Sequence, residues 1–417
     1  MSKVPSVGGS ADAPLTGQLY DIAVVGAGIV GLAVAREILL RRPDFRVVIF
    51  DREKFVAAHQ TGHNSGVIHS GIYYTPGSLK ARLCVEGARL MYAYCAQQGI
   101  AHERCGKLIV ATTESELPQL DVLEARGRAN GVPGLRRVSA DEIVQIEPEC
   151  RGVSALYSPN TGIVDYRDVA RSLEAELRSL GAEFKLGCRV SSLHRYGHTT
   201  VLTHDGGSTG ARWAIACAGL WSDRLAEDAG APADPRIVPF RGAYLRLQRD
   251  HPPVVRGLVY PVPDPALPFL GVHITKQVNG DVLLGPTAMV VGAKDAYNVR
   301  TVRLRDLAST FLWPGTWRVG GRFWRTAVNE IHMAVSRRDF VRACSVYVPA
   351  LRRMKLESVG QAGVRAQAVG RDGTLVDDFV ISETPGATHL RNAPSPAATS
   401  SLALAREVVD RLEKHLS

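Results

Sequence analysis

The sequence lacks the features that define membrane-spanning, disulfide-bonded and nucleic-acid-binding proteins. No stretch approaches the roughly 18 consecutive apolar residues that a membrane-spanning helix needs. The seven cysteines are odd in number and include no Cys-x-x-Cys pair, so we expect reduced thiols in the cytoplasm and neither a disulfide framework nor a metal site. The Lys and Arg residues are scattered, so we expect no nucleic-acid partner. The net charge of +9 fits either a field that attracts a small anionic substrate or a surface without functional meaning.

The first residues also lack the apolar core of a signal peptide. Residues 1–19 are rich in Ser, Gly, Ala and Pro, which predicts a flexible tail. The rest of the 417 residues is long enough for two domains. We place a nucleotide-binding domain at residues 20–85, 150–235 and 355–417, and a substrate-binding domain at residues 86–149 and 236–354.

A short apolar run, a glycine-rich turn and a helix-forming segment follow one another near the start of the chain. The run Ile22 to Val25 predicts a buried strand, and Gly26-x-Gly28-x-x-Gly31 follows it directly. Gly26 permits a tight turn, Gly28 removes the Cβ that would block a pyrophosphate, and Gly31 lets the helix approach the strand. The helix N-terminus then offers N–H groups and a partial positive charge to phosphates.

An acidic residue ends the next predicted strand. Residues 46–50 predict a second buried strand, and Asp51 follows it, twenty residues after Gly31. A carboxylate at this position accepts hydrogen bonds from the ribose hydroxyls of an adenine dinucleotide. The glycine motif alone would equally indicate a turn in some other α/β protein, but the strand, the helix and the acid together predict a dinucleotide site.

The segment 59–76 is dense in small polar residues, with three Gly and three His in 18 positions. This composition predicts a loop that lies against a ligand, a plain surface loop being the alternative. Thr61, Asn64 and Ser65 are suited to hydrogen-bond phosphate or ribitol oxygens, and Gly66 allows a close backbone approach.

The rest of the chain predicts a second pass through the nucleotide-binding sheet and then a different sheet. A strand near Val190 and a strand of small residues leading into Gly219 suit the first sheet. Residues 237–290 are strand-like and punctuated by Pro, which suits an antiparallel sheet covered by helices. In this region we expect His273 to end a strand that follows a Pro-rich segment. Helices are predicted at residues 78–98, 114–131, 166–180, 302–312, 326–334 and 336–346, and after a loop at 392–402.

These motifs together resemble the FAD-dependent oxidoreductases of the D-amino-acid-oxidase type (DAO family). The resemblance rests on the glycine motif, Asp51, the segment 61–66, Ala-Gly-Leu-Trp-Ser-Asp at 218–223 and Gly-Val-Arg at 363–365. Further segments are similar to the branch of the family that oxidises L-2-hydroxyglutarate, namely residues 61–74, 260–265, 268–273, 363–367 and 392–399.

The resemblance implies an α/β fold with a Rossmann-like FAD-binding domain of the glutathione-reductase type and an inserted antiparallel-sheet α+β substrate domain. It implies FAD held non-covalently, because no Cys stands in the pattern of the covalent-flavin members. Asp51 stands where the family more often has Glu. The residues expected to hold FAD are Gly26, Gly28, Ile29, Val30, Gly31, Asp51, Thr61, Asn64, Ser65, Gly66, Val67, Val190, Ala218, Gly219, Gly363, Arg365, Pro394, Ser395 and Thr399.

The reaction implied by the resemblance is oxidation of an L-2-hydroxy acid, L-2-hydroxyglutarate to 2-oxoglutarate, with hydride transfer to flavin N5. Its hydroxyl proton needs a base, for which His is suited. His273 and His69 are the candidates, with His273 placed first, although a packing role is the alternative for each. Arg365 is the first candidate to bind a substrate carboxylate, because a guanidinium binds carboxylates in bidentate fashion. Further substrate contacts are expected from Tyr73, Tyr260 and Arg241, and less so from Lys80.

Other functions remain open from the sequence. The same fold serves amino-acid and amine oxidases and hydroxy-acid oxidases specialised for other pathways, and a flavoprotein without turnover belongs to a different class. Two His in the pocket argue against an amine oxidase, whose neutral substrate needs less help from a base. The electron acceptor can be oxygen, a quinone or another carrier, and a quinone would imply a peripheral membrane contact. The sequence does not define the oligomeric state.

Overall fold

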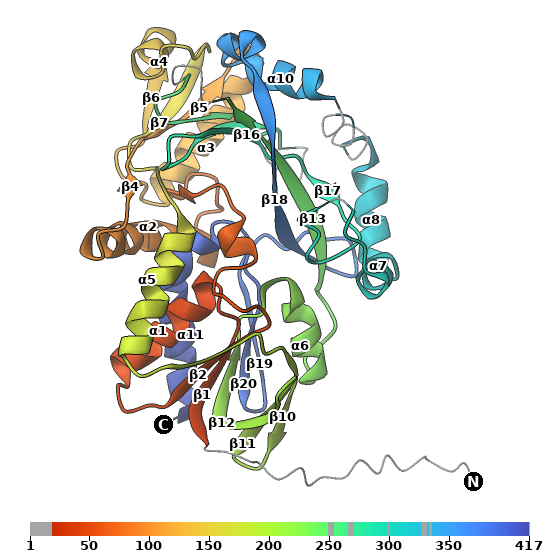
Figure 1. Cartoon of the computed structure of the whole chain (residues 1–417). Coiled ribbons are helices and arrows are strands. Elements are labelled where there is room, and N and C mark those ends of the chain that lie inside the picture. Colours follow the sequence, from red (N-terminus) through yellow and green to blue (C-terminus); the bar gives the residue numbers. More distant parts are fainter. Residues whose placement is uncertain are drawn as a thin grey trace.

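The computed structural model describes residues 19–248, 254–265, 271–298, 300–326, 332 and 336–416. The predicted tail up to residue 18 and most of the helix predicted at 326–334 lie outside these ranges. Two large mixed sheets, one above the other in Figure 1, form the framework of the described chain.

The first sheet contains the elements predicted around the glycine motif. Its order is β10-β11-β12-β1-β2-β9, with β20 beside β12 and β19 beside β20. Strand β1 is parallel to both β2 and β12, and β20 is parallel to β12. The carboxyl ends of these strands therefore meet at one edge, where open α/β sheets bind ligands. The strands are β1 (Tyr20–Val25), β2 (Val47–Asp51), β9 (Glu183–Leu186), β10 (Val190–Tyr196), β11 (Thr199–His204), β12 (Gly207–Ala216), β19 (Val380–Thr384) and β20 (Ala387–Asn392).

Both faces of this sheet are covered. Ile22 and Val24 pack into the core beneath the helices, whereas Ala23 and Val25 pack into a separate core on the opposite face. This is why strand β1 has no polar position among residues 22–25. The helices on the left of the sheet in Figure 1 are α1 (Ile29–Arg41), α5 (Tyr166–Ser179) and α11 (Ala397–Leu416), with α2 (Leu79–Gln97) packed on α11. The short helices η1 (Gln60–Gly62), η3 (Gly219–Trp221) and α6 (Ser222–Asp228) follow strands of this sheet.

The second sheet has the order β17-β13-β16-β15-β14-β5-β7-β6, with β18 paired to β13. Its pairs are antiparallel except β14 with β5, so the sheet expected to be antiparallel is mixed. His273 begins strand β15, whereas we expected it to end a strand, so this prediction of its position within the strand was wrong. The strands are β5 (Lys107–Ala111), β6 (Arg136–Ser139), β7 (Ser154–Ser158), β13 (Arg236–Leu247), β14 (Leu258–Pro261), β15 (His273–Lys276), β16 (Val282–Gly285), β17 (Met289–Val290) and β18 (Leu356–Val369).

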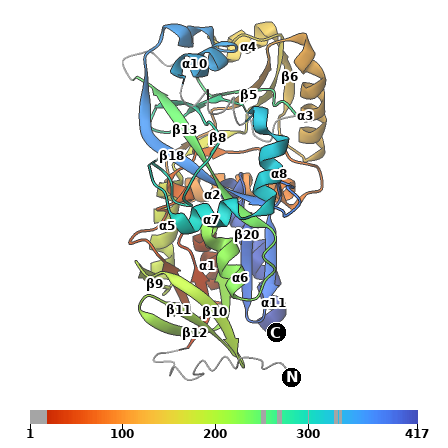
Figure 2. The same ribbon diagram turned by 90° about the vertical axis from the view of Figure 1, so that its right-hand side faces the viewer.

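Helices and a small sheet complete the described fold. The small sheet joins β3 (Val67–Ile68), β8 (Gly162–Val164) and β4 (His102–Glu103). Figure 2 shows α7 (Leu304–Phe311) and α8 (Pro314–Arg322) on one side of the long strands β13 and β18; α8 was not predicted. The remaining helices are η2 (Glu114–Glu116), α3 (Leu117–Ala129), α4 (Ala140–Ile146), α10 (Arg337–Ser345) and η4 (Pro349–Arg353).

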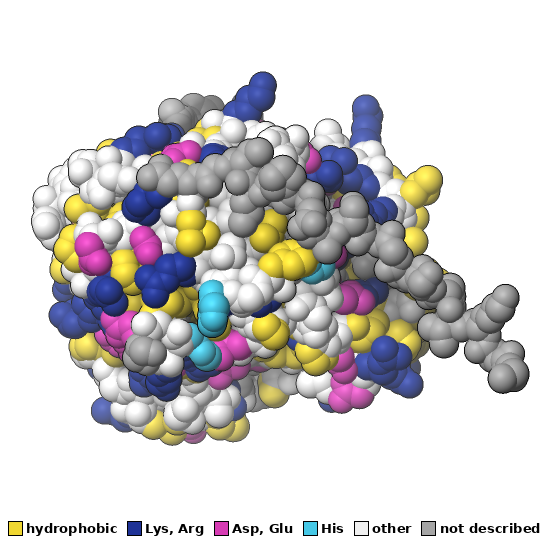
Figure 3. Space-filling view, turned by 90° about the horizontal axis from the view of Figure 1, so that it is seen from below, with side chains coloured by type: hydrophobic (Ala, Val, Ile, Leu, Met, Phe, Trp, Pro, Cys, Tyr) yellow, Lys and Arg dark blue, Asp and Glu magenta, His cyan; other side chains and the backbone are white. Residues whose placement is uncertain are grey.

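Along the chain, groups of strands that belong to the first sheet alternate with groups that belong to the second sheet, as a discontinuous two-domain arrangement requires. Strands β7 and β18 are hydrogen-bonded into the second sheet, although they lie within residues 150–235 and 355–417, which we assigned to the nucleotide-binding domain. The exact domain boundaries therefore stay a proposal. On the face seen in Figure 3, Lys and Arg side chains are interspersed with Asp and Glu, so the basic excess does not form one patch there.

Candidate active site

A cavity of about 830 Å³ lies against the carboxyl ends of the parallel strands. This volume is in the range typical of small-molecule and cofactor sites. Its wall combines the first turn of α1, residues between 58 and 69, the residues that follow β12, residues 363–366 of β18, and residues between Leu390 and Thr399, which run from the end of β20 into the first turn of α11. Segments from the first, middle and last parts of the chain therefore build one site.

The glycine turn has the geometry that the motif predicts. Gly26 has a φ of 112°, and an added Cβ would lie 2.3 Å from the Cys217 carbonyl oxygen. A Cβ on Gly31 would lie 1.9 Å from the Gly26 carbonyl oxygen. Gly28 precedes the first residue of α1 and lines the cavity. The turn thus brings bare backbone and a helix N-terminus to the wall, which suits a pyrophosphate.

Asp51 closes the neighbouring part of the wall, at the end of β2. The Ala27 N–H donates to one of its carboxylate oxygens at 2.7 Å, and the Glu53 N–H donates to the other at 2.8 Å. Burial raises the pKa of Asp51, and these two amides partly offset that effect. Each carboxylate oxygen keeps a second acceptor direction, so Asp51 can still accept a ribose hydroxyl.

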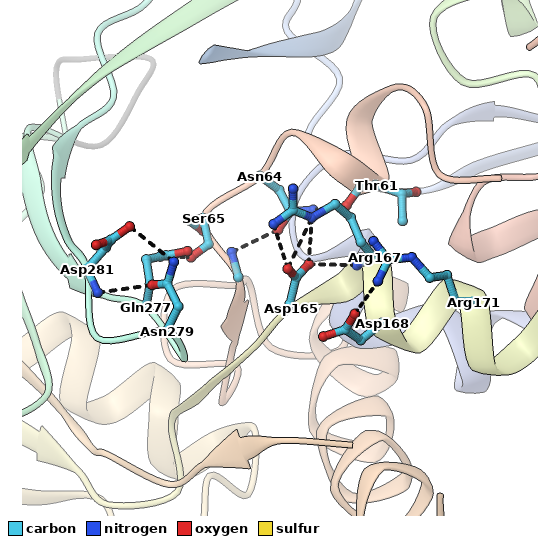
Figure 4. Close-up of polar contacts among 11 residues, drawn as sticks. Thr61, Asn64, Ser65, Asp165, Arg167, Asp168, Arg171, Gln277, Asn279 and Asp281 are labelled. Atoms are coloured by element: carbon cyan, nitrogen blue, oxygen red, sulfur yellow. Dashed lines mark hydrogen bonds and ion pairs between the residues drawn. The ribbon is translucent and has the colours of Figure 1, made fainter. Parts of the chain in front are cut away.

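The polar loop after β2 is held by its own side chains and by Gln277, and Figure 4 shows Asn64, Ser65 and Gln277 among their polar contacts. The Ile29 N–H donates to Thr61 Oγ1 at 3.0 Å, and Asn64 Oδ1 accepts from the Gly66 N–H at 2.8 Å. Gln277 Nε2 donates to the Ser65 carbonyl oxygen at 2.7 Å. Thr61, Asn64 and Ser65 line the cavity, whereas Gly66 does not, because its backbone packs against Val164 of β8.

The start of the last helix anchors the loop that carries His69. The Thr399 hydroxyl accepts from the His69 backbone N–H at 3.1 Å and donates to the Val67 carbonyl oxygen at 3.2 Å. It also lies 3.0 Å from the Tyr166 hydroxyl. Thr399 lines the cavity together with Pro394 and Ser395, as predicted for the loop before this helix.

A half-buried histidine, His69, and a buried histidine, His273, lie at one end of the site. His69 lines the cavity, and its Nδ1 has no hydrogen-bond partner among the described residues. Burial, and then the nearby positive charge of Lys107, lower the pKa of His69 well below 6.5. His273 lies off the cavity wall, where its ring stacks on Tyr260 at 4.0 Å between centroids. Burial lowers the pKa of His273 to about 4. Both imidazoles are therefore neutral near pH 7, the state in which a histidine accepts a proton.

The predicted substrate-binding residues divide into two groups. Arg365 lines the cavity and is exposed to its open space. The protein around it lowers the pKa of Arg365 by desolvation. Its guanidinium nevertheless stays charged near pH 7, because the unperturbed pKa of arginine is so high. Tyr73 and Tyr260 are packed beside the cavity and not on its wall. Arg241 points away, because its Nε donates to the Tyr297 carbonyl oxygen at 3.2 Å. Lys80 is paired with Asp377 at 2.7 Å.

The structure places three further groups at or beside the site. Tyr244 and Arg391 line the cavity, and Lys107 of β5 lies buried beside the two tyrosines. Lys107 is 1% exposed, although it begins the otherwise apolar strand Lys-Leu-Ile-Val-Ala. The sequence signal for this burial was the position of Lys107 directly before four apolar strand residues. The predicted wall residues Ile29, Val30, Val67, Val190, Ala218, Gly219 and Gly363 do line the cavity.

The fold and the glycine turn define a class of protein, and comparison with known families identifies it. The family model described as FAD dependent oxidoreductase (DAO) matches residues 21–411. The chain belongs to this family, and its cofactor is FAD. The predicted fold class and cofactor are therefore confirmed.

Relatives within the family carry a narrower name. The chain is 45% identical to L-2-hydroxyglutarate dehydrogenase, mitochondrial, of Nematostella vectensis, over 94% of this chain and 90% of the relative. It is 42% identical to the protein of that name in Homo sapiens, over 98% and 92% of the two chains. It is 41% identical to L-2-hydroxyglutarate dehydrogenase of Indibacter alkaliphilus, over 94% and 98%. The predicted resemblance is thus confirmed.

Solved structures support the fold. L-alpha-glycerophosphate oxidase from Mycoplasma pneumoniae, with FAD bound, matches with a TM-score of 0.76 at 23% identity, over 95% of each chain. Glycine oxidase from Geobacillus kaustophilus matches with a TM-score of 0.70 at 21% identity, also over 95% of each chain. Among the described residues, no helix has the length and apolar character needed to cross a membrane.

Proposed function

We propose that this protein oxidises L-2-hydroxyglutarate to 2-oxoglutarate with FAD. The observation that carries the proposal is that a neutral His69 and a cationic Arg365 both lie on the wall of one cavity. A base and a carboxylate-binding cation are what oxidation of a 2-hydroxy acid requires. The names of the relatives at 41–45% identity support the particular substrate.

FAD binding is assigned to the residues around the glycine turn. The bare backbone at Gly28 and the N-terminus of α1 suit the pyrophosphate, and Asp51 suits the adenosine ribose. The loop 394–399 suits the flavin end, because a helix N-terminus stabilises negative charge. When bound, FAD supplies the acceptor for the hydride that leaves the substrate α-carbon. We keep non-covalent binding as a prediction.

We assign the base to His69, although the sequence placed His273 first. His69 lies on the cavity wall with an unpartnered ring nitrogen among the described residues, whereas His273 lies behind the wall. His273 Nδ1 lies 3.0 Å from the Gly271 carbonyl oxygen, so Nδ1 carries the proton and the imidazole is oriented. His69 would take the hydroxyl proton, and Arg365 would orient the carboxylate next to the reacting carbon.

The electron acceptor stays a prediction among oxygen, a quinone and another carrier. The cytoplasm also stays a prediction, because the names of the eukaryotic relatives place those proteins in mitochondria, whereas the name of the Indibacter alkaliphilus relative gives no compartment.

The proposal is tested by mixing the purified FAD-bound protein with L-2-hydroxyglutarate under anaerobic conditions and following the visible flavin absorbance. Rapid bleaching is expected with the L-enantiomer and not with D-2-hydroxyglutarate or L-glutamate. Bleaching with L-glutamate would instead indicate an amino-acid oxidase. Absence of bleaching with L-2-hydroxyglutarate would rule out the proposed substrate.

A further inference from the structure

Lys107 is a fully buried lysine without a negatively charged partner among the described residues. It is 1% exposed, and its Nζ lies 4.7 Å from the ring centre of Tyr73 and 5.0 Å from that of Tyr260. Within the described ranges, the acidic group that acts on Lys107 is the Cys84 thiol, and burial raises the pKa of that thiol to about 12. Lys107 contrasts with Lys80 and Lys294, the other buried lysines described, which are paired with Asp377 and Asp223 at 2.7 and 2.6 Å.

A buried ammonium normally requires a counter-ion. Contacts with two tyrosine faces stabilise a cation only partly, because such contacts are weaker than the cost of removing the ammonium from water. Two further buried polar atoms beside it lack partners among the described residues, namely the Tyr73 hydroxyl and His69 Nδ1. A cation and two unsatisfied polar atoms in one place indicate that an anionic ligand completes this group.

The second sheet sets Lys107 and Arg365 on two sides of His273. In the strand order β18-β13-β16-β15-β14-β5, Arg365 is on β18, His273 on β15 and Lys107 on β5. Both cations act on the two imidazoles, since their positive charges contribute to lowering the pKa of His69 and of His273. Of the two cations, only Arg365 is on the wall of the FAD cavity. Two cations on two sides of the histidines suit a ligand with two carboxylates.

We propose that Lys107 binds the distal carboxylate of the substrate and makes the enzyme selective for dicarboxylic 2-hydroxy acids. Arg365 would bind the carboxylate next to the reacting carbon. The Tyr73 hydroxyl would donate to the same distal carboxylate as Lys107. The inference rests on the proposed function for its substrate, but the binding site itself can be tested without turnover.

The first test uses the unmodified FAD-bound protein and two unreactive ligands of equal length, glutarate and valerate, which differ by one carboxylate. Binding is measured by isothermal titration calorimetry. Glutarate should bind about 10- to 100-fold more tightly at pH 7. Burial lowers the pKa of Lys107 to about 8, so this preference should decline as the pH rises from 7 to 9.5.

Among the described titratable groups beside Lys107, the histidines, the tyrosines and the Cys84 thiol titrate outside this pH range, whereas Lys80, whose pKa burial also lowers, is paired with Asp377. His69 and His273 are neutral above 6.5, and the hydroxyls of Tyr73 and Tyr260 and the Cys84 thiol have pKa values raised by burial. Equal affinity for glutarate and valerate at pH 7, or a preference that stays constant to pH 9.5, would overturn the proposal.

The second test replaces the ammonium. Lys107→Met should abolish the preference for glutarate and lower kcat/KM for L-2-hydroxyglutarate about 10- to 100-fold, with less than about a threefold effect on L-2-hydroxyvalerate. Lys80→Met is the matched control, because it removes a buried lysine that is already paired. Any effect of Lys80→Met should be the same for both substrates. An equal loss with both substrates in Lys107→Met would show a structural role and overturn the proposal.

The outcomes separate this inference from the proposed function. If the unmodified protein prefers glutarate and Lys107→Met does not, the carboxylate site stands even where L-2-hydroxyglutarate is not oxidised. If L-2-hydroxyglutarate is oxidised but Lys107→Met keeps the preference for glutarate, the proposed function stands and the Lys107 site fails. Should Lys107→Met fold poorly, the pH series on the unmodified protein decides the question alone.

Discussion

Gly31 leaves no room for a side chain, because a Cβ there would lie 1.9 Å from the Gly26 carbonyl oxygen. We predict that Gly31→Ala displaces α1 from the glycine turn and yields a purified protein with little or no FAD. Gly320→Ala is the control, because Gly320 lies in α8 with nothing within 4 Å of an added Cβ. The ratio of flavin to protein absorbance measures the effect. Full FAD content in Gly31→Ala would contradict the assigned pyrophosphate site.

The pH dependence of turnover measures the protonation state of the catalytic base. A base must be neutral, and burial with nearby cations lowers the pKa of His69 well below 6.5, so the neutral form persists into mildly acidic solution. We therefore predict that kcat/KM for L-2-hydroxyglutarate stays constant from pH 7.5 down to about 6 and falls only at lower pH. A fall centred at about pH 6.5 or above would contradict the assignment.

Substitution distinguishes the two histidines. His69→Gln should lower kcat by about 100-fold or more and remove the acidic fall in kcat/KM. His273→Gln should keep that acidic fall. The opposite pair of results would make His273 the base, as the sequence suggested.

Single residues were predictable where the signal is local. Asp51 and the glycines of the turn lie on the cavity wall, and the sequence could indicate this position because it depends on spacing within one strand–turn–helix unit. Lys107 was not predicted to belong to the site, since a lysine that begins a strand is normally solvated. Its burial is imposed by Tyr73 and Tyr260, which are distant in the sequence.

At the scale of elements, one hydroxyl connects the last helix to the loop of the proposed base. Thr399→Val keeps the shape of the side chain but leaves the His69 N–H and the Val67 carbonyl oxygen without this partner. We predict retained FAD, destabilisation by about 1–3 kcal/mol and a lower kcat, because His69 loses its anchor. Thr399→Ser keeps the hydroxyl and should stay close to the unmodified enzyme. Thermal unfolding and steady-state kinetics of both variants measure this, and an unchanged kcat in Thr399→Val would contradict the anchoring role.

Elements with a clear period and a cap were predictable from the sequence. Asp165 accepts a hydrogen bond from the Arg167 N–H at the start of α5, where the sequence predicted a helix start. Helix α8 was missed, because Pro314 and the pair Gly320-Gly321 are unfavourable inside helices. Pro314 in fact occupies the first helical position, where proline is tolerated.

At the scale of the molecule, a buried ion pair joins helix α6 to the segment that follows strand β17. Lys294 Nζ lies 2.6 Å from Asp223 Oδ1, and the two side chains are 0% and 3% exposed. Asp223→Asn would deprive the buried lysine of its hydrogen-bonded counter-ion and leave only the more distant Asp306 carboxylate among the described acidic groups that act on it, so we predict a loss of about 3–5 kcal/mol in unfolding free energy. Denaturant unfolding measures it.

The matched control for this prediction is an exposed pair. Glu174→Gln breaks the ion pair with Arg178 on the surface of α5 and should cost less than about 0.5 kcal/mol. The double variant Asp223→Asn with Lys294→Met should recover part of the stability, because no unpaired charge remains. Equal losses for Asp223→Asn and Glu174→Gln would contradict the importance of burial.

The class of fold was predictable as a whole, but the strand order of the second sheet was not. The sequence indicated parallel strands around the glycine motif, and the first sheet has them. Strands β13 and β18 pair along most of their length, although they are far apart in the chain, and nothing local specifies such a pairing. Long-range pairing of this kind is decided by packing of the complete chain.

The distribution of the cavity wall along the chain has a consequence for protein synthesis. The wall needs residues from Val25 to Thr399, and α1 is covered by α11, which ends the described chain. The first strand, turn and helix leave the ribosome long before the segments that close the site over them. The nascent chain therefore exposes the part of the apolar surface of α1 that α11 covers until α11 has been synthesised, and the cavity wall is complete only then. A shortage of FAD would therefore affect the stability of the polypeptide after the cavity wall has formed and not the folding of its first strand, turn and helix.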